Sequence, residues 1–217
     1  MATHRKRAST KRLRYKQNGV VMQNKVELIN ITPNYMDLLK HAIGMCHQTK
    51  VGDKVVKHCI KAGHLSVLEH CTATFEISCS IQMLLQLTRH RHLSFTVQSS
   101  RVTPLTESYK TGNEMVDCMN SKIIDNYNDY CELSETPQEV NAYLLPKSAM
   151  YNLVVTGNFR AWFEYLPKRM CARAQTEHRE VANEIKRLLA ENAPEIFKDV
   201  TAPCSNCNET SCDFSIK

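Results

Sequence analysis

The sequence predicts a single α+β domain. A chain of 217 residues with 42% hydrophobic content is long enough to bury one sizeable core, and it has too few prolines and glycines for a disordered or fibrous protein. Strand-like alternation and helical spacing follow each other irregularly, and no glycine-rich fingerprint marks a dinucleotide-binding fold. We therefore expect a mostly antiparallel or mixed sheet with long helices.

Five elements are expected in the first half of the chain. Phe75, Ile77 and Cys79 alternate with polar residues, which is typical of a strand. Apolar residues at helical spacing indicate helices before and after it, and Gly63 is a natural helix stop. The expected elements are a strand at 25–31, helices at 35–49 and 54–62, a strand at 72–80 and a helix at 81–89.

The second half of the chain begins with a polar, loop-rich segment and continues with regular helices and a strand. Residues 104–136 are polar, with a helix expected near 113–126, and a helix at 139–145 stops at Pro146. A strand at 151–156 is bounded by Gly157-Asn158, and helical patterns then run to about residue 192, interrupted at Pro167. The apolar stripe that we assign to the core consists of Ala182, Ile185, Leu188 and Leu189.

The positive charge of the chain belongs to a tail at 1–17. Seven of the 28 lysines and arginines lie in residues 1–16, which contain no acid, so the rest of the chain is near neutrality. Such a block is a solvated, mobile segment or a contact for nucleic acid or another polyanion. The remaining boundaries that we expect are a catalytic domain at 18–200 and a cysteine-containing tail at 201–217.

The cysteine pattern favours reduced thiols in a cytoplasmic protein. No secretory signal and no run of 18 apolar residues occurs, so neither export nor a membrane span is expected. At the end of the chain, Cys204, Cys207 and Cys212 supply three potential zinc ligands, for which His178 is a possible fourth. The alternative is a flexible tail without metal, and we expect no metal site.

Residues 89–101 are the segment richest in chemical groups. Arg89, Arg91 and Arg101 lie among hydroxyl side chains, and no carboxylate balances them. Guanidinium groups match the geometry of phosphate, and hydroxyls can complete such a site. Three interpretations are open: a phosphate or nucleotide site, a basic solvated turn, or a metal site that uses His90 and His92.

The same segment resembles the hallmark motif of the flavin-dependent thymidylate synthases. Arg89-His90-Arg91 is followed by Ser99 at the family's spacing, and Gln86 precedes the motif by three residues. The flanking segments that match in order, over 26 to about 204, are Gly63 to His70, Tyr143 to Pro146, Gly157 to Arg160, Arg169 through Arg173-Ala174-Gln175 with Glu177, and Ala202-Pro203-Cys204.

The resemblance implies an enzyme that is a homotetramer with active sites at subunit interfaces. FAD would carry the one-carbon unit from methylenetetrahydrofolate to C5 of dUMP, and NADPH would supply electrons. The implied cofactor-binding residues are His64, Ser66, Arg89, His90, Arg91, Asn158, Arg160 and Glu164. The implied substrate-binding residues are Gln86, Arg89, Val97, Gln98, Ser99, Ser100, Arg101, Arg169 and Arg173.

Arg169 is the implied catalytic residue. A guanidinium stays protonated and can stabilise negative charge at N3 and O2 of uracil, which activates C5. Without the resemblance, Arg169 would be read as a surface arginine. For Ser99 we prefer a binding role to a nucleophilic one, because no Gly-x-Ser-x-Gly elbow surrounds it and the sequence positions no base.

Several positions depart from the family pattern. Ala142 stands where an arginine commonly contacts the nucleotide, and loss of one such contact costs about 1.5–3 kcal/mol. Lys110 or Lys147 could compensate. The other departures are Val97 for an acidic or amide side chain, Val102 for tyrosine, Glu164 for asparagine and Thr176 for tryptophan.

Three functions follow from these observations. The first is methylation of dUMP. The second is methylation or hydroxymethylation of another pyrimidine nucleotide such as dCMP. The third is nucleic-acid binding through residues 5–16, against which the absence of aromatic RNA-binding motifs argues. No membrane partner is expected.

Overall fold

The computed structural model describes residues 24–209 and 212, so the predicted basic tail lies outside the described residues. Its elements, in chain order, are β1 (Val26–Ile31), α1 (Tyr35–His47), α2 (Asp53–Lys61), η1 (Leu65–His70), β2 (Thr72–Ser80), α3 (Ile81–Leu87), β3 (Leu93–Val97), α4 (Glu114–Leu133), α5 (Gln138–Asn141), η2 (Ala142–Leu144), β4 (Met150–Asn158), α6 (Phe159–Met170), α7 (Thr176–Asn192), α8 (Pro194–Phe197) and η3 (Pro203–Asn206). The prediction of an α+β fold is confirmed.

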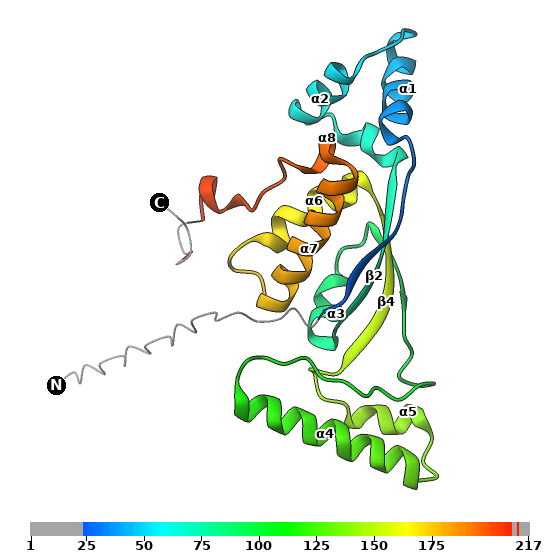
Figure 1. The fold of residues 1–217 in the computed structure, drawn as a ribbon, viewed down its shortest axis with the longest axis vertical. Coiled ribbons are helices and arrows are strands. Elements are labelled where there is room, and N and C mark those ends of the chain that lie inside the picture. The colour runs from blue at the N-terminus through cyan, green and yellow to red at the C-terminus, as the bar shows by residue number, and fades with distance from the viewer. Residues whose placement is uncertain (1–23, 210–211, 213–217) are drawn as a thin grey trace, which may run out of the picture.

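An antiparallel sheet in the order β1-β2-β4-β3 forms the centre of the fold. Helices α3, α6 and α7 lie on one side of it (Figure 1). Ala73, Phe75 and Ile77 of β2 point to that side and are fully buried, because the side chains of a strand alternate between its two faces. The other face is polar, and the hydroxyls of Thr74 and Thr156 lie 2.9 Å apart on it.

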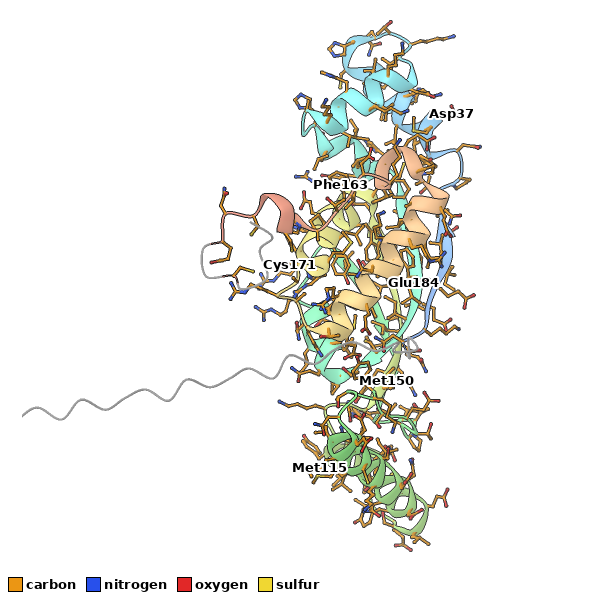
Figure 2. All side chains as sticks on the ribbon, turned by 60° about the vertical axis from the view of Figure 1, so that its left-hand side comes forward. Asp37, Met115, Met150, Phe163, Cys171 and Glu184 are labelled. Atoms are coloured by element: carbon orange, nitrogen blue, oxygen red, sulfur yellow. The ribbon has the colours of Figure 1, made fainter. Side chains whose placement is uncertain are left out.

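The remaining helices extend the molecule beyond both ends of the sheet. Figure 1 shows α1 and α2 at one end and α4 and α5 at the other. In Figure 2, Asp37 of α1 and Met115 of α4 mark these opposite ends. Helix α4 presents large apolar side chains to solvent, since Met115 is 74% exposed and Leu133 is 87% exposed. None of the helices in the described residues combines the length and apolar character needed to cross a membrane.

Most expected elements occur where the sequence predicts them, but one prediction is wrong. Pro167 does not interrupt the helical region, because it lies inside α6; the break comes at 171–175. A proline removes a single backbone donor, and Leu166 and Met170 on either side of it are buried in the core and hold the helix together. The structure also adds strand β3, which the sequence analysis does not predict.

Gly157 allows β3 and α6 to approach β4 closely. A Cβ at this position would lie 2.4 Å from Cδ2 of Leu93 and 3.1 Å from the indole nitrogen of Trp162. That nitrogen donates a 3.0 Å hydrogen bond to the carbonyl of Ala73, so the indole has little freedom to move. Glycine therefore places the start of β3, and the turn before it, against the N-terminus of α6.

Candidate active site

The residues from Arg89 to Arg101 do not form one continuous loop. The turn that contains Arg89 and His90 follows α3, β3 comes next, and a second turn begins at Ser99. Leu93 at the start of β3 pairs with Gly157, and Val97 at its end pairs with Leu153. A five-residue strand spans about 17 Å, so the two halves of the motif lie at opposite ends of β3.

His90 and Arg169 meet between α3 and the end of α6. The Nε of Arg169 donates to Nε2 of His90 at 2.8 Å, and its Nη2 reaches the carbonyl of Gln86 at 3.5 Å. These three residues, which the sequence analysis assigns to the site, are thus brought together. The guanidinium is held at one edge, which leaves its other donors without a hydrogen-bond partner among the described residues.

His90 is a neutral imidazole at neutral pH. Burial lowers its pKa to about 4, and the positive charges of Arg169 and Lys168 act in the same direction. Because Nε2 accepts the hydrogen bond from Arg169, the proton of the neutral ring sits on Nδ1. His90 is therefore an acceptor that orients the arginine.

A second histidine, His178, is fully buried next to this contact. Tyr165 packs edge-on against the His90 ring at 4.8 Å between centroids, and its hydroxyl lies 3.0 Å from Nε2 of His178. Both Tyr165 and His178 are buried in the core. Burial, with the charge of Arg169 next in size, lowers the pKa of His178 to about 3.

The side chain of Gln86 is connected to α7 through a chain of polar groups. Its Nε2 donates to Oε1 of Gln175, whose Nε2 donates to Glu177 at 3.3 Å. Glu177 is 1% exposed and accepts from the backbone N–H of Ser80 at 2.7 Å and from its hydroxyl. Burial raises the pKa of this carboxyl, and the two bonds from Ser80 oppose that shift.

The N-terminus of α6 forms a separate polar group beside the Arg89–His92 turn. Oδ1 of Asn158 caps the helix by accepting from the N–H of Ala161 at 2.8 Å. Arg160 pairs with Glu164 at 2.9 Å and with Glu69 of η1 at 2.6 Å. His64, which precedes η1, and Ser66, which lies within it, are exposed.

At the far end of β3, Ser99 and Arg101 line a surface cavity of about 320 Å³ with residues of α5. Arg101 forms an exposed ion pair with Glu139 at 2.8 Å. Ser100 is tied to the same helix, because its carbonyl accepts from Nε2 of Gln138 at 3.1 Å. Gln98 accepts from the N–H of Asn152 at 3.2 Å, and its own N–H donates to the carbonyl of that residue.

Arg173 and the cysteine-containing segment lie by the loop between α6 and α7. Arg173 pairs with Glu209 at 3.5 Å, and the N–H of Ala172 points to Sγ of Cys204 at 3.5 Å. His178 is committed to Tyr165 in the core. No group of three or more potential metal ligands occurs in the described part of the chain.

Comparison with known proteins identifies the family. The model of the thymidylate synthase complementing protein family (Thy1) matches residues 27–195. The chain belongs to this family of flavin-dependent thymidylate synthases.

Named relatives agree with this assignment. The probable flavin-dependent thymidylate synthase of Mycobacterium phage D29 is 32% identical over 181 residues, which cover 73% of this chain and 77% of the relative. The flavin-dependent thymidylate synthase of Mycobacteroides abscessus is 33% identical over 177 residues, or 70% and 71% of the two chains.

A solved structure shows the same fold. Thymidylate synthase X from Helicobacter pylori, crystallised with FAD and dUMP, matches with a TM-score of 0.73 and 25% identity. The match covers 82% of this chain and 98% of the other. The chain is therefore an enzyme of the flavin-dependent thymidylate synthase family.

The sequence gives Glu177 of this thymidylate synthase no role, and it offers His178 only as a possible zinc ligand. Glu177 and His178 precede Val181 and Ala182 by four residues each, so they continue the buried stripe of α7. A charged residue and an imidazole on such a stripe need polar partners, which is a signal that sequence alone contains. Their partners Ser80 and Tyr165 cannot be read from the sequence.

The half-buried His90 and the buried His178 predict that the free energy of unfolding falls with acid. In the folded chain both stay neutral below pH 6.5, where they would be protonated in the unfolded chain, so the unfolded state binds more protons as the pH falls. The free energy of unfolding should decrease from pH 6.5 toward pH 4, with His178 contributing up to about 1.4 kcal/mol per pH unit. Urea titrations at several pH values measure this slope.

The variant His178→Phe separates this contribution from the rest. Its slope below pH 6.5 should be shallower than that of the wild type, while the two slopes should agree above about pH 8, where both histidines are neutral in the folded and the unfolded chain. Equal slopes below pH 6.5 would show that His178 is not buried as a neutral ring.

Proposed function

We propose that the chain binds FAD and methylates dUMP at C5 to give dTMP, with methylenetetrahydrofolate as the one-carbon donor and NADPH as the source of electrons. The observation that carries the proposal is the tethered guanidinium of Arg169 beside Gln86 and His90. The family assignment and the solved relative with FAD and dUMP support it.

Arg169 has the properties needed to activate a uracil ring. C5 becomes nucleophilic when negative charge at N3 and O2 is stabilised, and a protonated guanidinium offers paired donors to those atoms. The bond to His90 fixes its orientation before a ligand arrives, so little reorganisation is needed when charge develops. A neutral His90 also avoids placing a second cation against the arginine.

The residues near the start of β3 fit a flavin dinucleotide. Arg89 and Arg91 are exposed, and within the described residues neither takes part in an ion pair, so both are available to a diphosphate. Asn158, Arg160, His64 and Ser66 lie around the adjoining start of α6. When bound, FAD would supply the redox and one-carbon chemistry, while these residues bind and orient it.

The residues beyond the end of β3 suit the nucleotide phosphate. Within the part of the chain that the structure describes, Arg101 pairs only with the exposed carboxylate of Glu139, and such surface pairs contribute little free energy. A phosphate dianion accepts charge-assisted hydrogen bonds from a guanidinium and can therefore displace that partner. Ser99 and the turn after it add hydroxyl and backbone donors to the same cavity.

The separation of these groups favours a site shared between copies of the chain. Arg101 lies a full strand length from Leu93, while Arg169 lies near the start of that strand, so one chain does not gather all the proposed contacts in one place. Exposed apolar residues such as Met115, Leu133 and Tyr143 offer surfaces for association. We therefore propose a homotetramer with active sites at its interfaces.

A spectrum and a tritium-release assay test the function. The purified protein should show the visible absorbance of bound flavin, and it should release tritium from 5-labelled dUMP when methylenetetrahydrofolate and NADPH are present. Release from 5-labelled dCMP alone would assign another pyrimidine nucleotide. A protein that takes up no FAD and releases tritium from neither nucleotide would contradict the proposal.

Arg169→Ala should abolish turnover while flavin and dUMP stay bound. The loss should exceed about 100-fold in kcat, because the guanidinium stabilises charge that develops only in the transition state. Tritium release measures the loss of turnover, and the visible spectrum of the flavin shows that the cofactor is still bound. Arg187→Ala is the matched control, since Arg187 is a surface residue of α7 paired with Glu184 and Glu191. Unchanged turnover in Arg169→Ala would remove the assignment of the activating group.

A further inference from the structure

Helix α3 is fixed at both ends to the start of α7. Just before its first residue, Ser80 caps α3 by accepting from the N–H of Met83 at 3.1 Å, and it donates its own N–H and hydroxyl to Glu177. In the last turn of α3, Gln86 donates to Gln175, the residue that precedes α7. The position of the Arg89–His92 turn depends on these two attachments.

The buried carboxylate also fixes which way each amide points. Glu177 receives three donors, from the N–H and hydroxyl of Ser80 and from Nε2 of Gln175, so it acts as an ionised acceptor. Gln175 must therefore turn its Oε1 toward Gln86, and Gln86 must donate to it through Nε2. The Oε1 of Gln86 makes no hydrogen bond to any described residue.

The guanidinium of Arg169 contacts the backbone carbonyl of the same glutamine at 3.5 Å, so Gln86 and Arg169 belong to the same part of the site. Gln86 is half-buried, so its carboxamide remains accessible at the site. The site therefore combines an oriented acceptor with an oriented cation.

We propose that Glu177 and Gln175 are positioning residues that make Gln86 present its carboxamide oxygen to a hydrogen-bond donor of the bound nucleotide. The donor is the ribose hydroxyl, because the N–H of the uracil ring is at N3, the atom to which Arg169 donates in the proposed reaction. This inference rests on the proposed function, since the ligand is the nucleotide of that reaction.

Isosteric substitutions test the direction of the hydrogen bonds that run from Gln86 through Gln175 to Glu177. Glu177→Gln places an NH₂ where Gln175 now donates, so Gln175 and Gln86 must both invert, and Gln86 then offers a donor to the nucleotide. Gln86→Glu alone places a carboxylate against the oxygen of Gln175. In the double variant these changes agree, because the inverted Gln175 donates to the new carboxylate at position 86, whose free oxygen again faces the ligand.

The double-variant cycle is measured on the flavin-loaded protein by the Kd for dUMP and by urea unfolding. Each single variant should weaken dUMP binding about 10-fold, and the double variant should bind about 10-fold more tightly than the product of the single effects. The unfolding midpoint should recover in the same way. Gln82→Glu, on the exposed side of α3, adds the same charge, and its combination with Glu177→Gln should be additive in both measurements.

A nucleotide analogue tests this donor. The coupling between positions 86 and 177 in nucleotide binding should vanish with 2′,3′-dideoxyuridine monophosphate, which lacks the ribose hydroxyl. Coupling that persists with this analogue, or that occurs in unfolding but not in dUMP binding, would overturn the proposed contact. If the effects of the two single variants on the free energy of unfolding are additive, the proposed orientation of the Gln175 and Gln86 amides would be overturned.

The experiment distinguishes failure of the proposed function from failure of the proposed amide orientation. A flavin-loaded wild type that binds no dUMP would contradict that function together with the nucleotide contact. The unfolding cycle needs no ligand and tests the orientation of Gln175 and Gln86 independently.

Discussion

The hydrogen bond from Arg169 to a neutral His90 is the interaction on which the arrangement of the site depends. It joins the end of α6 to the turn after α3, two segments far apart in the sequence. The bond exists because burial against Tyr165 keeps the imidazole uncharged, so its Nε2 is an acceptor. A protonated ring would place two cations in contact and release the guanidinium.

Two features of the core position the residues of this contact, namely Gly157 and the buried Glu177. Gly157 brings the start of β3 against α6, and this close approach positions the Arg89–His92 turn that precedes β3. The buried Glu177 holds α3 to α7, which sets the direction from which Gln86 approaches. A carboxylate in the core is costly unless it is satisfied, and Ser80 and Gln175 provide the donors that make it tolerable.

The elements with strong periodicity were predicted from the sequence, whereas strand β3 was missed because its residues also fitted a ligand-binding segment. Strand β2 and the buried stripe of α7 follow directly from alternation and helical spacing. Leu93, Phe95 and Val97 also alternate with hydroxyl residues, but those hydroxyls resembled a phosphate site, so β3 was not predicted. Resemblance placed Arg169 and His90 in one site, whereas their direct bond follows from how α6 packs on the sheet. The partner of a buried acid such as Glu177 is likewise set by tertiary packing, which periodicity does not contain.

A crystal structure of the chain with FAD and dUMP is the most direct measurement of this account. It should show Arg169 still bonded to Nε2 of His90, with its remaining donors within about 3 Å of O2 and N3 of the uracil ring. A uracil ring held by other residues, with Arg169 turned away from His90 and the nucleotide, would contradict the account.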